Sequence, residues 1–64
     1  MSTYAVEARR SGLPGLWELH IAGVGVTQSH RLGDDAEFMV RDYLQVVGAA
    51  DWDTAVLVIA EVDD

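Results

Sequence analysis

The feature that most constrains the fold is a change of hydrophobic period near residue 34. Before it, apolar and polar residues alternate, as they do in half-buried strands. After it, apolar residues recur three and four positions apart, which puts them on one face of a helix. This helical stripe is formed by Ala36, Met39, Val40, Tyr43, Leu44 and Val47. Because strand patterns flank the stripe within 64 residues, the sequence predicts one helix packed on one sheet.

The first strand is predicted over residues 3–9, where Tyr4, Val6 and Ala8 occupy alternate positions. The next residues, 10–16, contain a serine, two glycines and a proline, which predict a loop. Two strand-like segments on either side of such a loop indicate a hairpin.

The second strand is predicted over residues 16–22, whose bulky tryptophan, leucine and isoleucine alternate with smaller or polar residues. Gly23 and Gly25 permit the positive φ values of a tight return. Residues 24–30 contain several β-branched or polar residues and predict a third strand, so three antiparallel strands are expected.

Both ends of the predicted helix carry end signals. Asp34 and Asp35 precede the apolar stripe, and either side chain is a candidate N-cap. Glu37 adds negative charge to the first turn, where the helix dipole favours it. Gly48 follows the stripe where a left-handed C-terminal cap commonly forms.

The last strand is predicted over residues 54–62, which are apolar on both faces. One helix covers only one face of a sheet, so this strand predicts a homodimer with Leu57 and Ile59 at or near the subunit contact. The alternative is a central strand whose outer face is covered by loops.

These elements predict a single α+β domain over residues 1–64 in the order β-β-β-α-β. The expected architecture is a three-stranded antiparallel sheet, a right-handed crossover helix and a fourth strand parallel to the first. Inward strand positions and the helix stripe together predict a core of Tyr4, Val6, Trp17, Leu19, Ile21, Val40, Tyr43 and Val47.

The charge of the chain restricts the partners that it can bind. Eleven carboxylates stand against four arginines, giving a net charge of −7. Binding to phosphates needs a basic surface, so direct nucleic-acid binding is not expected and a basic protein partner fits better. No segment reaches the roughly 18 apolar residues of a membrane span, and no secretory signal is recognisable, so a cytoplasmic protein is expected.

The order of elements, with "VTQSHRL" leading into "AEFMVRDYL", resembles the N-terminal domain of HicB-like antitoxins. Its most specific parts are Thr27-Gln28, Arg31-Leu32 and the run at residues 39–42. The resemblance implies a partial RNase H-like fold that binds and neutralises a small basic RNA-cleaving toxin of the HicA type. The DNA-binding segment usual in that family has no counterpart in this sequence, so operator binding is not carried over.

Four residues are candidates for binding a partner. Phe38 breaks the helical stripe and points away from it, so it is either an exposed anchor or a ring folded back over the preceding loop. Glu7, Glu18 and His20 fall on the sheet face that one helix leaves open.

No enzyme, cofactor or metal site is predicted. RNase H-type catalysis needs several carboxylates around Mg²⁺, and Glu7, Glu18 and Glu61 are the only set worth checking. The alternatives to an antitoxin are therefore a small metal-dependent nuclease of the same fold, or a stand-alone dimerisation module without a toxin partner.

Overall fold

The three predicted antiparallel strands form side by side. The computed structural model describes residues 2–62 of the chain. In it β1 (Thr3–Arg10) pairs antiparallel with β2 (Trp17–Ile21), and β2 pairs antiparallel with β3 (Gly25–Ser29). The alternation of side chains therefore predicted the strands correctly.

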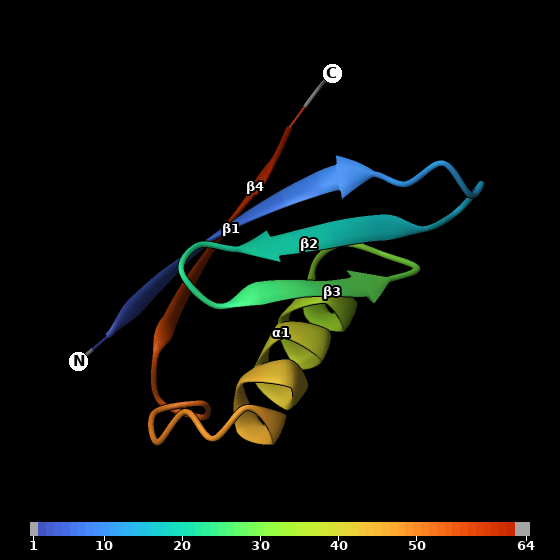
Figure 1. Ribbon diagram of the computed structural model, residues 1–64. Helices are drawn as coiled ribbons and strands as arrows, with labels where there is room; N and C mark the ends of the chain where they lie inside the picture. Colours follow the sequence, from blue (N-terminus) through green and yellow to red (C-terminus); the bar gives the residue numbers. More distant parts are fainter. Residues whose placement is uncertain (1, 63–64) are drawn as a thin grey trace.

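The last strand joins the same sheet. After the crossover helix α1 (Asp34–Val46), β4 (Val56–Glu61) lies parallel to β1, as predicted. The first three strands thus do not form a separate sheet: the sheet is mixed and four-stranded, with the order β3-β2-β1-β4 (Figure 1). The fold is α+β, with one helix packed against one face of the sheet.

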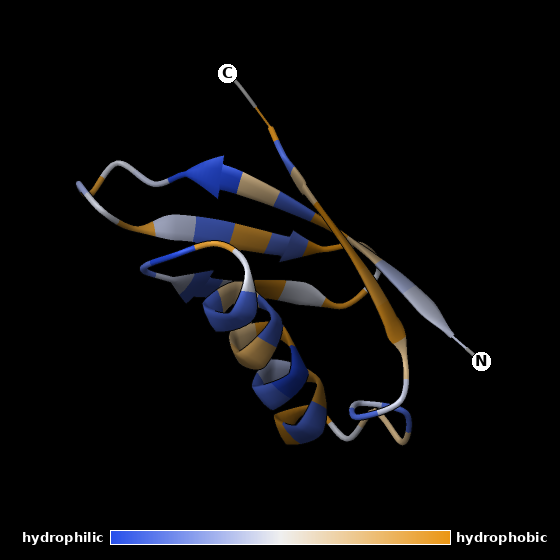
Figure 2. Ribbon diagram, turned by 180° about the vertical axis from the view of Figure 1, so that it is seen from behind, coloured by the Kyte–Doolittle hydropathy of each residue, from blue (hydrophilic) through white to orange (hydrophobic). Residues whose placement is uncertain are grey.

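The helix covers the sheet unevenly. It packs mainly against β3, with some contact to β2 and at most slight contact with β4. β4 is hydrophobic along most of its length, whereas β1 and β2 alternate (Figure 2). Residues 2–62 contain no helix that could span a membrane.

The core lies between α1 and the inward positions of the sheet. Of the predicted core, Val6, Leu19, Ile21 and Val40 are buried, and the three predicted aromatic residues pack partly buried around them. Val47 is 51% exposed, so its assignment to the core was wrong. The reason is that α1 ends at Val46, before the stripe reaches that position. The buried set is Val6, Ala8, Leu19, Ile21, Ala36, Val40, Leu44 and Ala55.

The two glycines of the β2–β3 turn have different roles. Gly23 is the third residue of a four-residue turn over residues 21–24, and its φ is +76°. The Val24 N–H closes this turn by donating to the Ile21 carbonyl at 3.0 Å. Gly25 has no positive φ, so the expectation for that position was wrong. It is required for space instead, because a Cβ there would collide with the hydroxyl of Tyr43.

The N-terminal cap of α1 is Gly33, with φ +76°, and no side chain caps the helix. The prediction that Asp34 or Asp35 is the cap was therefore wrong, because the helix already begins at Asp34 and both carboxylates lie within its first turn. There they still face the positive end of the helix dipole.

The C-terminal signal was read correctly. Gly48 has φ +86°, its N–H donates to the Gln45 carbonyl at 3.1 Å, and the Ala49 N–H donates to the Leu44 carbonyl at 2.9 Å. These two bonds form a Schellman motif, which satisfies the last carbonyls of the helix.

Hydrogen bonds from two side chains hold the segment between α1 and β4. The half-buried Arg41 donates to the carbonyls of Trp52 at 2.9 Å and Ala55 at 3.1 Å. The Tyr4 hydroxyl donates to the Asp51 carboxylate at 2.9 Å. The segment therefore lies against α1 and β1, and it delivers the chain to the edge beside β1.

Candidate interaction surfaces

The four predicted partner-binding residues lie on two opposite sides of the molecule. Phe38 stands on the outer side of α1, which covers one face of the sheet. Glu7, Glu18 and His20 lie on the other face, since their strand neighbours are the buried residues that face the helix. No single site contains all four.

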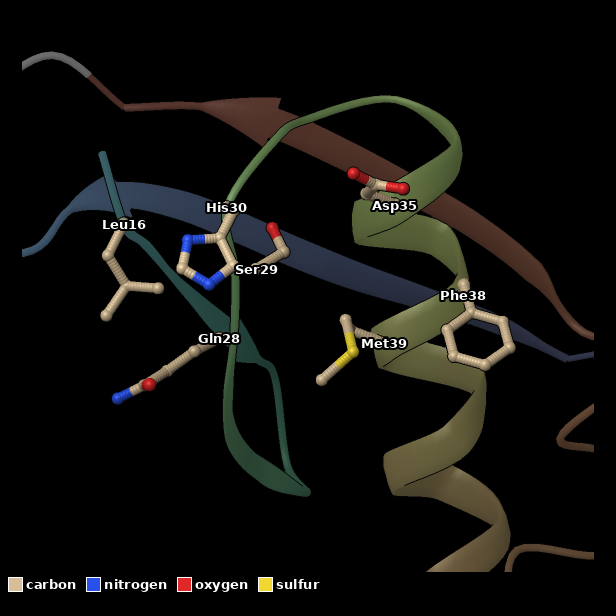
Figure 3. Close-up of a pocket in the computed structure, with 7 residues that line it drawn as sticks. All are labelled: Leu16, Gln28, Ser29, His30, Asp35, Phe38 and Met39. Carbon is tan, nitrogen blue, oxygen red and sulfur yellow. The ribbon is translucent and has the colours of Figure 1, made fainter.

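The outer side of α1 presents a row in which acidic and apolar residues alternate. Asp34, Phe38, Asp42 and Val46 recur every fourth position and so lie one above another along the helix; we call this row the helix surface. Phe38 is 67% exposed and Val46 is 78% exposed. The Phe38 ring is therefore in solvent rather than folded over the preceding loop, and it projects from α1 away from Met39, which points toward β3 (Figure 3).

The aspartate carboxylates on and beside the helix surface are not paired with any cation of the described residues. Within residues 2–62, no ion pair joins Asp34, Asp35 or Asp42, whereas Glu37 accepts a hydrogen bond from Arg41 Nε at 3.2 Å. The last turn of α1 contains no basic residue. The ring of Phe38 is thus surrounded by negative potential, which favours a cationic partner.

A hollow of about 340 Å³ opens between α1 and β3, next to the helix surface (Figure 3). The Ser29 hydroxyl in the wall of this hollow is buried and donates to the Arg31 carbonyl at 2.7 Å, so its proton is already used in a hydrogen bond within the protein. The volume is near the lower end of ligand pockets and is sufficient for a side chain of a partner. Sequence reasoning missed this hollow because its lining comes from three separate segments: Leu16, Gln28, Ser29, His30, Asp35, Phe38 and Met39.

On the open sheet face, each predicted polar residue has a polar partner. Arg9 Nη2 donates to Glu7 Oε1 at 3.2 Å, and His20 Nε2 lies 3.1 Å from Glu18 Oε1. A second hollow, of about 540 Å³, lies over β1, β2 and the β2–β3 turn and includes Glu7 and His20. The same face carries exposed valines on both edge strands, Val26 on β3 and Val56 and Val58 on β4.

The carboxylates considered for metal binding do not converge. Glu61 is opposite the buried Ala8 in the β1–β4 register, so its side chain points to the helix side of the sheet. Glu7 and Glu18 lie on the other side. Among residues 2–62, no group of three or more His, Cys, Asp and Glu side chains is placed to hold a metal ion.

The two residues predicted at a subunit contact face the core. Leu57 and Ile59 are opposite Tyr4 and Val6 and pack, partly buried, against the core cluster. Their backbones nevertheless belong to β4, an edge strand of the sheet.

No family model, curated protein or solved structure matches this chain. The resemblance to HicB-like antitoxins therefore stays a prediction that rests on the sequence pattern. The described residues form a small acidic domain with one aromatic side chain exposed on a charged helix and an open sheet edge at β4.

Proposed function

We propose that this protein is a non-enzymatic protein-interaction module of the HicB-like antitoxin type, which binds and neutralises a small basic RNA-cleaving toxin. The observation that carries the proposal is the exposed ring of Phe38 between Asp34 and Asp42 on α1. A secondary support is the element order β-β-β-α-β with β4 parallel to β1, which agrees with what the sequence resemblance implies.

An exposed aromatic ring gains free energy when a partner covers it. Full burial of a phenylalanine side chain is worth about 1.5–3 kcal/mol, and most of the Phe38 ring is still available for burial. Aromatic residues at the centre of an interface are frequent anchors because they fill a pocket and exclude water. Phe38 is therefore the side chain of α1 best placed to anchor a partner.

The surrounding carboxylates supply orientation and selectivity. Asp34, Asp35 and Asp42 are unpaired within the described residues, and the whole chain carries a net charge of −7. A basic RNA-binding protein approaches such a surface faster than a neutral one, and an acidic competitor is repelled. Once bound, the acidic helix occupies the surface that would otherwise contact RNA phosphates.

The test uses the small basic protein encoded beside this gene as the probe, with RNA cleavage and isothermal titration as readouts. A stoichiometric amount of this protein should abolish cleavage, and Phe38→Ala should weaken binding at least about tenfold. Leu13→Ala is the matched control, because Leu13 is also exposed but lies in the β1–β2 loop. Affinity should fall with increasing salt.

Two results contradict the proposal. One is the absence of a small basic protein encoded beside the gene. The other is a basic neighbour that still cleaves RNA in the presence of excess protein, or that binds the Phe38→Ala and Leu13→Ala variants equally well.

A further inference from the structure

β4 leaves a row of backbone hydrogen-bonding groups unused. The N–H groups of Val56 and Val62 donate to β1 or its flanking residue, at 2.8 Å each. Because alternate residues of a strand direct their N–H and C=O groups to opposite sides, Leu57, Ile59 and Glu61 direct theirs away from β1. Among residues 2–62, no strand lies on that side of β4.

The two edges of the sheet differ in protection. Natural edge strands are guarded by charges, proline, bulges or a covering element. α1 packs against one face of β3, which is the shorter edge strand and is formed by the glycine-containing, more polar sequence GVTQS. The free edge of β4 has no neighbouring strand or helix among residues 2–62, and residues 56–60 contain no charge, proline or glycine. Val56 and Val58 add exposed apolar side chains to this edge, at 44% and 53% exposed.

We propose that two copies of this chain pair antiparallel along β4 and form one continuous eight-stranded sheet. The two-fold axis passes between the Ile59 residues of the two copies. This inference is independent of the proposed toxin binding, because it uses the edge of the sheet rather than the helix surface. Both helices then lie on the same side of the long sheet, and Phe38 of each copy remains accessible.

The register follows from the groups that β4 offers. Opposed residues of an antiparallel pair share one face of the sheet, so Leu57, Ile59 and Glu61 must oppose residues of the same set. When Ile59 lies opposite the partner's Ile59, Leu57 lies opposite the partner's Glu61. Leu57, Ile59 and Glu61 then all form hydrogen-bonded pairs. Since each such pair exchanges two bonds, about six backbone hydrogen bonds join the copies.

A register shifted to centre on Val58 is poorer. It would place Glu61 opposite Ala55, whose backbone is already used: its N–H donates to the Asp51 carbonyl at 2.9 Å, and its carbonyl accepts from Arg41 at 3.1 Å. Only Leu57 and Ile59 would then form hydrogen-bonded pairs. The chain itself therefore selects the Ile59 register.

A second copy fits this edge better than a basic partner does. Residues 56–60 are uncharged and Glu61 is the one carboxylate of β4, so the edge attracts a basic protein less than the helix surface does. In the Ile59 register each Val58 opposes a small alanine, Ala60 of the partner subunit, on the open face. Glu61 meets Leu57 of the partner subunit instead of a second carboxylate.

Glu61→Pro is the sharpest test, with Glu61→Ala as its matched control. Glu61 is exposed, and its N–H points to the free edge, so proline removes an edge donor without removing a bond to β1. Wild type and Glu61→Ala should dimerise in sedimentation equilibrium at micromolar to millimolar concentration. Glu61→Pro should raise the dimer Kd at least about tenfold while its circular dichroism stays that of the folded chain.

A spin label at position 26 distinguishes this arrangement from two sheets stacked face to face. The chain contains no cysteine, so Val26→Cys, on exposed β3, gives a single labelling site. Edge pairing separates the two β3 strands by seven strand spacings, or about 34 Å, whereas stacked sheets keep the labels within about 20 Å. A dimer at the long distance that is sensitive to Glu61→Pro supports the proposal. A monomer throughout, a short distance, or a dimer indifferent to Glu61→Pro overturns it.

Discussion

The close approach of Tyr43 to Gly25 predicts that alanine at position 25 destabilises the protein, because one atom, the Tyr43 hydroxyl oxygen, occupies the space of its methyl group. A Cβ built at Gly25 would lie on the Tyr43 hydroxyl, 3.0 Å from Cζ and 3.3 Å from Cε1 of the ring. The ring is partly buried against the core, so it cannot move aside without losing contacts. Gly25→Ala should therefore destabilise the protein by about 1–3 kcal/mol, the usual cost of overpacking, although alanine alone favours an extended backbone by about 0.4–1 kcal/mol.

Tyr43→Phe supplies the matched second substitution, because it removes the atom that the new methyl group would strike. No hydrogen bond from the Tyr43 hydroxyl occurs within the described residues, so Tyr43→Phe alone should change stability by less than about 0.5 kcal/mol. In the double variant the cost of Gly25→Ala should fall by about 1 kcal/mol or more, which is a favourable coupling energy. The remaining cost comes from the ring carbons, which stay close to the new Cβ.

Urea unfolding followed by tryptophan fluorescence measures these differences in the free energy of unfolding. Equal midpoints by fluorescence and by far-UV circular dichroism check that unfolding is two-state. A domain of this size has roughly 3–5 kcal/mol of stability, so the predicted loss is a large fraction of it. A Gly25→Ala variant as stable as the wild type would refute the argument from space. Additive free energies in the double variant would show that Tyr43 is not the obstacle.

Two further predictions follow from burial and from one polar contact. Leu44→Ala should cost about 2–5 kcal/mol because Leu44 is fully buried, whereas Val47→Ala, with half its surface in solvent, should cost less than about 1 kcal/mol; equal urea midpoints for the two would contradict the observed helix register. Hydrogen bonds from the Ser2 hydroxyl and then from the Tyr4 hydroxyl hold the pKa of Asp51 below its ordinary value of 3.8, and the bond to Asp51 raises the pKa of Tyr4 above 10.0. This contact should therefore stabilise the fold between about pH 4 and pH 10, with the Asp51 part lost as pH falls below 4 and the Tyr4 part lost as pH rises above 10. Asp51→Asn should flatten both limbs of the stability–pH curve relative to Asp53→Asn, and an unchanged curve would show that the contact does not form in solution.

The candidate site was only partly predictable. The helical period placed Phe38 away from the stripe, and its exposure agrees, because the direction of a side chain on a helix depends on spacing alone. Strand parity likewise placed Glu7 and Glu18 on the open face. Their pairing with Arg9 and His20 and the hollow beside Phe38 were not predicted, since those contacts join residues through side-chain geometry or from separate elements.

The sequence by itself determined the kind and order of the elements, because period two and period 3.6 are local properties of the chain. It also determined the end of α1, since Gly48 alone among nearby residues adopts the left-handed conformation without a steric cost. The tertiary structure decided what depends on distant atoms. Tyr43 requires glycine at position 25, and Arg41 hydrogen-bonds carbonyls beyond the helix end. The tertiary structure also decided that α1 lies mainly against β3 and leaves the edge of β4 free. The sequence could not show this, because the lateral position of the helix is set by packing across the whole sheet and by no single segment.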